Sequence, residues 1–267
     1  MLVLTVLSLG GGAALAHFNG TAATEAGAAP AAPRVTPDVT ESEAPAAPKP
    51  TPTPKPTKPK PKPTPKRTTA APKPRKTTVP QSGAGTFTTA RAAGDVVGES
   101  GTLRRYRVAV EDGVDLSARE TAAEIQAILD HPRGWAAHGR GRFQLVSENA
   151  DFVIRIATPD TADALCLKQG LRTHGELNCE TSEGVVVNLK RWMLGSPTFA
   201  GEPAEYRHLI INHEVGHEIG IRTHMGCPGP GRLAPAMMQQ IKGLNGCRSN
   251  AFPYGEDGSY ITGPIVS

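Results

Sequence analysis

Residues 206–224 read YRHLIINHEVGHEIGIRTH, and this stretch decides both the expected fold and the expected chemistry. The apolar run at residues 209–211 predicts a buried helix, which we expect to cover residues 202–219. His213 and His217 lie four positions apart in it. On a helix this spacing places both imidazoles on one face, where they can bind the same metal ion.

Glu214 directly follows the first of these histidines, so its carboxylate lies beside the ligand face and can reach a water molecule at the metal. Two imidazoles that bind Zn²⁺ and one carboxylate that transfers protons are the working groups of a zinc hydrolase. The helix is expected to bend at Gly220, and His224 then follows as the candidate third ligand. The alternative is that His213 and His217 are core histidines that satisfy their hydrogen bonds inside the protein.

The pattern HEVGHEIG at residues 213–220 resembles the metzincin signature of zinc peptidases, which have a glycine bend, a third histidine and a methionine turn. The later segments CPGPGR, APAMMQQ and GLNGC are similar to those of an actinobacterial family of exported proteins. That family is catalogued as a domain of unknown function and regarded as metzincin-type peptidases. The resemblance covers residues 87–254. It implies a metzincin-like fold with Met237 in the methionine turn, and Met238 is the adjacent alternative.

The third ligand departs from the metzincin pattern by one residue. The pattern places a histidine three residues after the glycine, where this chain has Thr223, and the histidine follows at His224. Threonine is a poor zinc ligand, whereas a loop can absorb one residue, so we expect His224 to bind. The carboxylates of Glu256 and Asp257 are the alternatives, since other zinc peptidases take a carboxylate from further downstream.

The four cysteines all lie in the C-terminal part of the chain. An even number of cysteines in an exported protein predicts two disulfides. Four cysteines allow three pairings, of which we expect the two short loops, Cys166–Cys179 and Cys227–Cys247. The alternative is one structural zinc held by four thiolates, although no pair shows the Cys-x-x-Cys spacing that such sites use.

The N-terminal part of the chain is expected to lie outside any folded domain. Residues 1–16, MLVLTVLSLGGGAALA, form an apolar run with a small-x-small end, typical of a signal peptide or an uncleaved membrane anchor. Residues 17–83 are rich in Pro, Lys and Thr and have few large apolar side chains, which predicts a disordered linker. We therefore expect a secreted or cell-envelope protein that contacts a membrane only through this N-terminal segment.

The charge is distributed unevenly. The net charge is +4, but residues 49–76 carry ten Lys and Arg and no acid, so the rest of the chain has a net charge of −6. A domain that is acidic as a whole lacks the basic face that nucleic acid requires, and we expect no nucleic-acid partner.

Residues 84–267 are expected to form one domain of mixed α/β (α+β) class. A capping-box pattern at residues 117–120 predicts the start of a helix with a single apolar face. We expect the strands to come first and the helices to pack on them, with loops after Gly220. Short runs with a strand pattern occur at residues 103–110, 142–146, 151–156 and 184–189.

Together these features predict an exported zinc-dependent peptidase with His213, His217 and His224 as metal ligands and Glu214 as the general base. The substrate is expected to be a peptide or protein, and amide bonds of cell-wall cross-links are one candidate. Tyr254 could donate a hydrogen bond to the reaction intermediate or could be a surface aromatic residue. The alternative function is a non-catalytic cell-envelope module that uses zinc for structure, which would not require Glu214.

Overall fold

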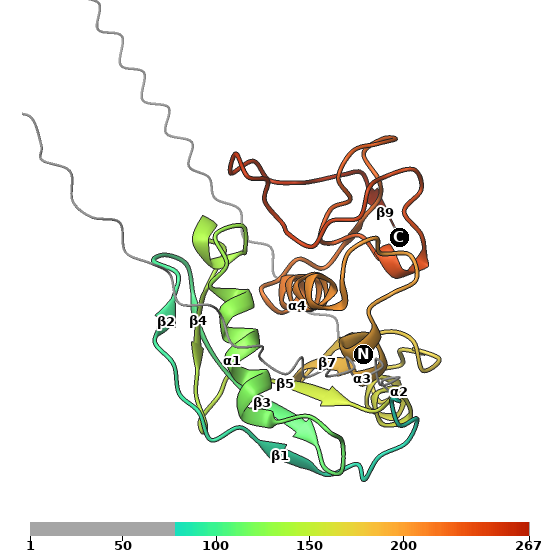
Figure 1. Cartoon of the computed structure of the whole chain (residues 1–267). Helices are drawn as coiled ribbons and strands as arrows, with labels where there is room; N and C mark the ends of the chain where they lie inside the picture. The colour runs from blue at the N-terminus through green and yellow to red at the C-terminus, as the bar shows by residue number, and fades with distance from the viewer. Residues whose placement is uncertain (1–77, 267) are drawn as a thin grey trace, which may run out of the picture. The chain divides into compact units, whose positions relative to one another are not determined.

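The structure, a computed structural model, describes residues 78–266 (Figure 1). The predicted leader and the predicted linker up to residue 77 lie outside the described residues. The α-helices are α1 (Ala118–Leu129), α2 (Pro159–Leu167), α3 (Leu189–Leu194) and α4 (Pro203–Glu218). The strands are β1 (Phe87–Thr89), β2 (Val96–Val97), β3 (Leu103–Glu111), β4 (Arg142–Leu145), β5 (Phe152–Ala157), β6 (Cys179–Thr181), β7 (Gly184–Asn188), β8 (His224–Met225) and β9 (Ile265–Val266). Two 3-10 turns, η1 (Ala136–His138) and η2 (Gln240–Lys242), complete the elements of this region.

Strands β1 to β7 form one mixed sheet with the order β2-β4-β3-β5-β7-β6, and β1 pairs with β3. The four central strands are parallel to their neighbours, whereas β1, β2 and β6 pair antiparallel. Parallel neighbours need a crossover connection, which α1 supplies between β3 and β4 and α2 supplies between β5 and β7. The expectation that strands precede helices was therefore wrong, because strands and helices alternate along the chain.

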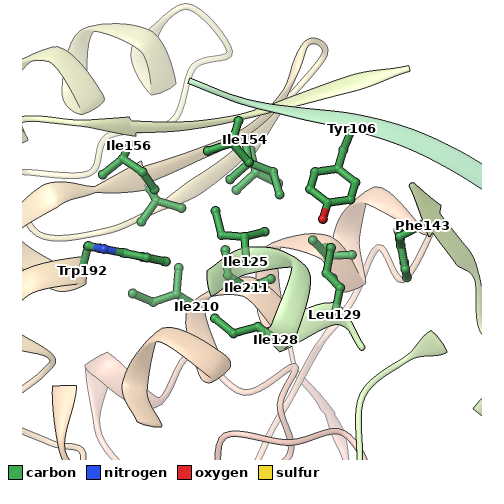
Figure 2. Packing of buried hydrophobic residues seen from close by; sticks show 14 of the residues in the cluster. Tyr106, Ile125, Ile128, Leu129, Phe143, Ile154, Ile156, Trp192, Ile210 and Ile211 are labelled. Carbon is green, nitrogen blue, oxygen red and sulfur yellow. The ribbon is translucent and has the colours of Figure 1, made fainter. Parts of the chain in front are cut away.

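The main core lies between the sheet and three helices. Helices α1, α3 and α4 pack on one face, and α2 packs on the other with a small cluster of its own. In Figure 2, Ile154 and Ile156 of β5 point toward Ile125 of α1 and toward Ile210 and Ile211 of α4. Each of these side chains is at most 2% exposed. Burying one aliphatic side chain of this size stabilises a fold by roughly 1.5–3 kcal/mol, so this layer fixes α4 against the sheet.

The strand patterns and both predicted helices are confirmed. The four predicted strands correspond to β3, β4, β5 and β7, and the predicted helix at residues 202–219 corresponds to α4. Ser117 caps α1 as expected, because its hydroxyl accepts a hydrogen bond from the Glu120 N–H at 3.3 Å. Helices α2 and α3 were not expected, and neither were the short strands β1, β2, β6, β8 and β9.

The chain contacts the fold slightly before the predicted domain start at residue 84. The Gln81 amide donates to the Asp160 carboxylate at 2.7 Å, and the Asp160 N–H donates to the Gln81 carbonyl at 3.1 Å. Gly85 N–H then donates to the buried Glu111 carboxylate at 2.7 Å. These bonds join the start of the described region to α2 and to the end of β3.

The segment after α4 contains little regular structure, as expected. Its regular elements are η2 and the short antiparallel pair β8–β9. In Figure 1 this segment, coloured orange to red, lies on the side of α4 away from the sheet. Helix α4 therefore has the sheet on one side and a loop-rich C-terminal segment on the other.

Candidate metal centre

Helix α4 carries three of the four predicted site residues. Its middle is buried through Leu209, Ile210 and Ile211, and this fixes the helix in the core. The Trp135 indole N–H donates to the Asn212 carbonyl at 2.8 Å, which anchors the helix again one residue before the first histidine. His213 and His217 then project from one face, one turn apart, with ring centroids 4.9 Å from each other.

The chain turns back at the end of α4 and brings the third histidine to the other two. Gly220 adopts φ +102°, a backbone conformation that L-residues rarely take. The Ile221 N–H donates to the Gly216 carbonyl at 3.0 Å, and strand β8 follows. The Nε2 atoms of His217 and His224 are 3.2 Å apart, and the ligand atoms of all three histidines lie within 4.8 Å of one another.

The one-residue departure is accommodated by the turn. Thr223 is exposed, and His224 is the residue that joins the histidine cluster. The β8–β9 pair aligns His224 with Val266, so the C-terminal end of the chain supports this position. The alternative carboxylates do not reach the cluster: Glu256 and Asp257 line a different cavity, and Asp257 accepts hydrogen bonds from the Ser259 backbone and hydroxyl.

Backbone carbonyls orient the two helix histidines. His213 Nδ1 lies 2.8 Å from the Ala236 carbonyl, and His217 Nδ1 lies 2.7 Å from the Ile221 carbonyl. A carbonyl oxygen only accepts, so each Nδ1 carries the proton and each Nε2 keeps its lone pair for a metal. Burial, with a smaller contribution from the charge of His217, lowers the pKa of His213 to about 3, so this imidazole is neutral. Burial also lowers the pKa of His224, and the positive charges of His217 and Lys242 lower it in the same direction.

Glu214 is a buried carboxylic acid beside the three histidines. It is 6% exposed and lines the same cleft as His213, His217 and His224. Burial raises its pKa to about 8, and the nearby charge of Glu180 acts in the same direction. A carboxyl group with this proton affinity can both take up and release a proton near neutral pH.

Met237 is the methionine that packs beneath the histidine helix. A Cβ placed on Gly216, which lies between the two helix histidines, would come within 3.1 Å of the Met237 methyl carbon and even closer to its sulfur. Met237 is 1% exposed and belongs to the main core. Met238 instead packs with Ala234 and Cys247 in a separate cluster. Of the two candidates for the methionine turn, Met237 is therefore the one that packs against the histidine helix.

A buried amide network holds the loop that carries Ala236 and Met237. The Gln240 side-chain amide donates to the Pro235 carbonyl at 3.2 Å and to the Asn250 carbonyl at 2.7 Å. The Asn250 side chain donates in turn to the Ala234 carbonyl at 2.9 Å. Buried amides of this kind rigidify a loop because every lost bond would leave a polar group unpaired. The carbonyl that orients His213 therefore has a fixed position.

Both disulfides connect the cysteines that the sequence predicted. Cys166 of α2 bonds to Cys179 of β6, and Cys227 bonds to Cys247. All four cysteines are thereby paired, which excludes the alternative of a zinc site built from four thiolates. The second disulfide closes the loop that contains Ala236 and Met237.

Tyr254 is buried and is not among the residues that line the cleft over the three clustered histidines. It is 6% exposed, and its ring stacks on His138 with centroids 3.7 Å apart. It also meets Trp135 edge-on at 6.1 Å. The expectation of a surface aromatic residue was therefore wrong, because Tyr254 packs against η1 and Trp135.

A cleft of about 370 Å³ opens over the histidines. No sequence pattern predicts most of its walls, because they come from loops far apart in the chain. Besides the four site residues it is lined by Leu171, Arg172, Thr173, Leu177, Asn178, Cys179, Glu180, Arg222, Gln239 and Lys242. A smaller cavity of about 60 Å³ shares part of this lining and has apolar groups in its wall, among them Leu209, Ile210 and Met238. Tyr206 lies in the smaller cavity, where burial raises its pKa to about 12.

The fold and the site define a disulfide-bonded mixed α/β protein whose three clustered histidines can hold a metal ion. Residues 73–259 match the family described as protein of unknown function (DUF3152). The match covers more than half of the 267-residue chain, and the protein belongs to this family. No curated protein and no solved structure matches the chain. Among residues 78–266, no helix is both long and apolar enough to cross a membrane.

Proposed function

We propose that this protein is an exported, zinc-dependent peptidase of metzincin type. The observation that carries the proposal is the convergence of three imidazoles beside the buried Glu214 in a single open cleft. Imidazole nitrogens are ligands that Zn²⁺ prefers, and three protein ligands leave the fourth position of a tetrahedral ion open. A structural zinc site requires a fourth protein ligand, so a three-histidine set favours catalysis over the alternative of a non-catalytic module.

The residues present fit a zinc ion. His213 and His217 direct their Nδ1 protons to carbonyls, which leaves both Nε2 lone pairs available, and His224 Nε2 lies beside them. The Gly220 bend and the Met237 contact with α4 support the metzincin resemblance. When bound at these histidines, zinc supplies Lewis-acid polarisation of a carbonyl group and lowers the pKa of water.

Glu214 supplies the proton transfers. In the proposed reaction its carboxylate accepts a proton from the attacking water, and the carboxylic acid then delivers that proton to the leaving amine. Its burial beside the cleft gives it the proton affinity for both steps. The peptide enters through the cleft, whose walls are built largely from the disulfide-closed segments.

Export is supported by the disulfides. Two paired disulfides persist in oxidising environments and are rare in the cytosol. They agree with the signal peptide or membrane anchor expected at residues 1–16. The substrate of an exported peptidase would be a peptide, a protein or an amide in a cell-wall cross-link.

The first test is the metal content of the purified full chain by mass spectrometry. We expect one zinc per chain in the wild type and in Thr223→Ala, and loss of that zinc in His224→Ala. Thr223→Ala is the matched control because it changes the residue that the usual spacing would assign. A correctly folded wild type that binds no zinc would refute the proposal.

The second test separates metal binding from catalysis. Glu214→Gln keeps the size of the side chain but removes its ability to carry the proton. We expect this variant to retain zinc and to lose at least about 100-fold in peptide hydrolysis, the usual contribution of a general base. Hydrolysis at the wild-type rate by Glu214→Gln would show that this residue has another role.

A further inference from the structure

Two positive side chains line the cleft without an acidic partner among the described residues. Arg172 lies in the loop between α2 and β6, and Lys242 is the last residue of η2. Both are exposed, and neither takes part in an ion pair within residues 78–266. Their positive charges are therefore available to a molecule that enters the cleft.

The other charged groups of the cleft do not neutralise this pair. Arg222 donates to both carboxylate oxygens of Glu180, at 3.1 and 3.2 Å, so these two charges compensate each other. Glu214 is only 6% exposed, so its carboxyl group does not lie at the solvent-facing wall. What remains at the solvent-facing wall is two positive charges, close to the three histidines.

Each of the two cations is carried by a loop that a disulfide closes. Arg172 lies between Cys166 and Cys179, and Lys242 lies between Cys227 and Cys247. A cation in such a loop has a restricted position, whereas one on a long free loop would lose much of its effect to chain motion.

Further hydrogen bonds fix the backbone next to each cation. The residue after Arg172, Thr173, is 3% exposed and donates its hydroxyl to Asp163, which also accepts the Gly175 N–H at 2.7 Å. On the other loop the Gln240 carbonyl accepts the Thr198 hydroxyl at 2.8 Å. The cleft thus presents positive charges at defined places, which is what selection of a charged ligand requires.

We propose that Arg172 and Lys242 select substrates that carry carboxylate groups close to the cleaved bond, so that the substrate of this protein is an acidic peptide. This inference rests on the proposed peptidase function and names its substrate class. Carboxylates of Asp or Glu side chains, or a nearby free C-terminus, would meet the two cations while the peptide bond lies over the histidines. Other residues of the cleft wall, such as Leu171, Leu177 and Gln239, carry no charge.

The test uses the zinc-loaded full chain and a mixture of synthetic peptides with randomised residues around a central position. Mass spectrometry identifies the bonds that are cleaved. We expect Asp and Glu to be enriched within a few residues of the cleaved bond. We also expect the enrichment to fall as the salt concentration is raised from about 0.05 to about 0.5 M, because screening of exposed charges becomes strong over this range.

Variants then assign the preference to the two cations. Arg172→Ala and Lys242→Ala should each lower kcat/KM for an acidic peptide by about fivefold, the effect of losing one exposed charge pair. Neither should change kcat/KM for the matched amide peptide, in which Asn and Gln replace Asp and Glu. Lys242→Glu should abolish the preference, because the new carboxylate balances the charge of Arg172. Arg119→Ala on α1 removes the same charge from an exposed site outside the cleft, and it should change neither rate.

The outcomes distinguish this inference from the proposed function. Cleavage without enrichment of acidic residues, or equal effects of Lys242→Ala and Arg119→Ala, would overturn the inference and leave the peptidase intact. If the wild type cleaves no peptide, the binding of fluorescent acidic and amide peptides to zinc-loaded Glu214→Gln tests whether acidic peptides are recognised. If Glu214→Gln binds the acidic peptide more tightly and Lys242→Glu removes this difference, the inferred recognition of acidic peptides holds and the peptidase function is rejected. Equal binding of the two peptides would reject both proposals.

Discussion

Opening the Cys227–Cys247 disulfide should weaken both the fold and the metal site. The two cysteines are 20 positions apart, and a closed loop of that length stabilises a protein by about 3 kcal/mol through the lost entropy of the unfolded chain. The loop also holds the Ala236 carbonyl that orients His213, and His224 lies three residues before it. Replacing both cysteines by alanine should therefore cost about 3 kcal/mol and reduce zinc affinity roughly tenfold, the lower range for loss of ligand support.

The Cys166–Cys179 disulfide is the matched control. Its separation of 13 gives nearly the same entropy, about 0.4 kcal/mol less in the chain-entropy model, but no group of its loop is hydrogen-bonded to a candidate ligand. Urea unfolding with a chelator present measures the stability loss of each double variant, and competition with a coloured chelator measures zinc affinity. Equal zinc affinities in the two double variants would refute the reasoning, and so would a loss below about 1 kcal/mol for the Cys227–Cys247 pair.

Three further changes test separate parts of the site. Gly220→Ala places a side chain at φ +102° with no atom within 4 Å, so the cost is backbone strain alone, about 1–2 kcal/mol in urea unfolding. Met237→Ala and Met238→Ala should each cost about 2–5 kcal/mol, but only Met237→Ala should also weaken zinc binding, measured by chelator competition. Burial lowers the pKa of His208, so the unfolded state binds more protons below about pH 6.5 and stability should fall as the pH drops through that value. His208→Gln should flatten this dependence in thermal unfolding followed from pH 7 to 5.

The elements that the sequence predicted are those with a local cause. Helix α4 follows from its buried apolar run and from the histidine spacing, and α1 follows from the Ser117 cap and one apolar face. Strands β5 and β7 are mainly β-branched and apolar, and β3 partly alternates apolar with charged residues, so all three are recognisable without a partner. Their order and parallel direction depend on contacts between distant residues, which no local pattern encodes.

The missed helices illustrate the same limit. Helix α3 has six residues and begins directly after β7, where the Asn188 side chain accepts the Lys190 N–H at 2.9 Å and so ends one element and starts the next. The strand pattern of residues 184–189 was visible, but an Asn that caps a helix cannot be told from an Asn that ends a strand by sequence alone. Strand β6 is three residues long and exists because β7 offers it a pairing edge.

The candidate site divides into a part that the sequence encodes locally and a part that it does not. His213, Glu214 and His217 share one helix, so their spacing fixes their geometry. His224 reaches them only because the turn after α4, the β8–β9 pair and the C-terminal loops hold it there. That segment has almost no helix or sheet to rigidify it.

Covalent and buried polar contacts replace regular structure in this half of the site. The Cys227–Cys247 disulfide closes the loop, the Gln240 and Asn250 amides fix its carbonyls, and Tyr254 stacks on His138 to hold the last part. A site of this design can change the walls of its cleft by altering loop residues while the histidine helix stays the same. Specificity would therefore reside in the disulfide-closed loops, where Arg172 and Lys242 lie, and chemistry would reside in α4.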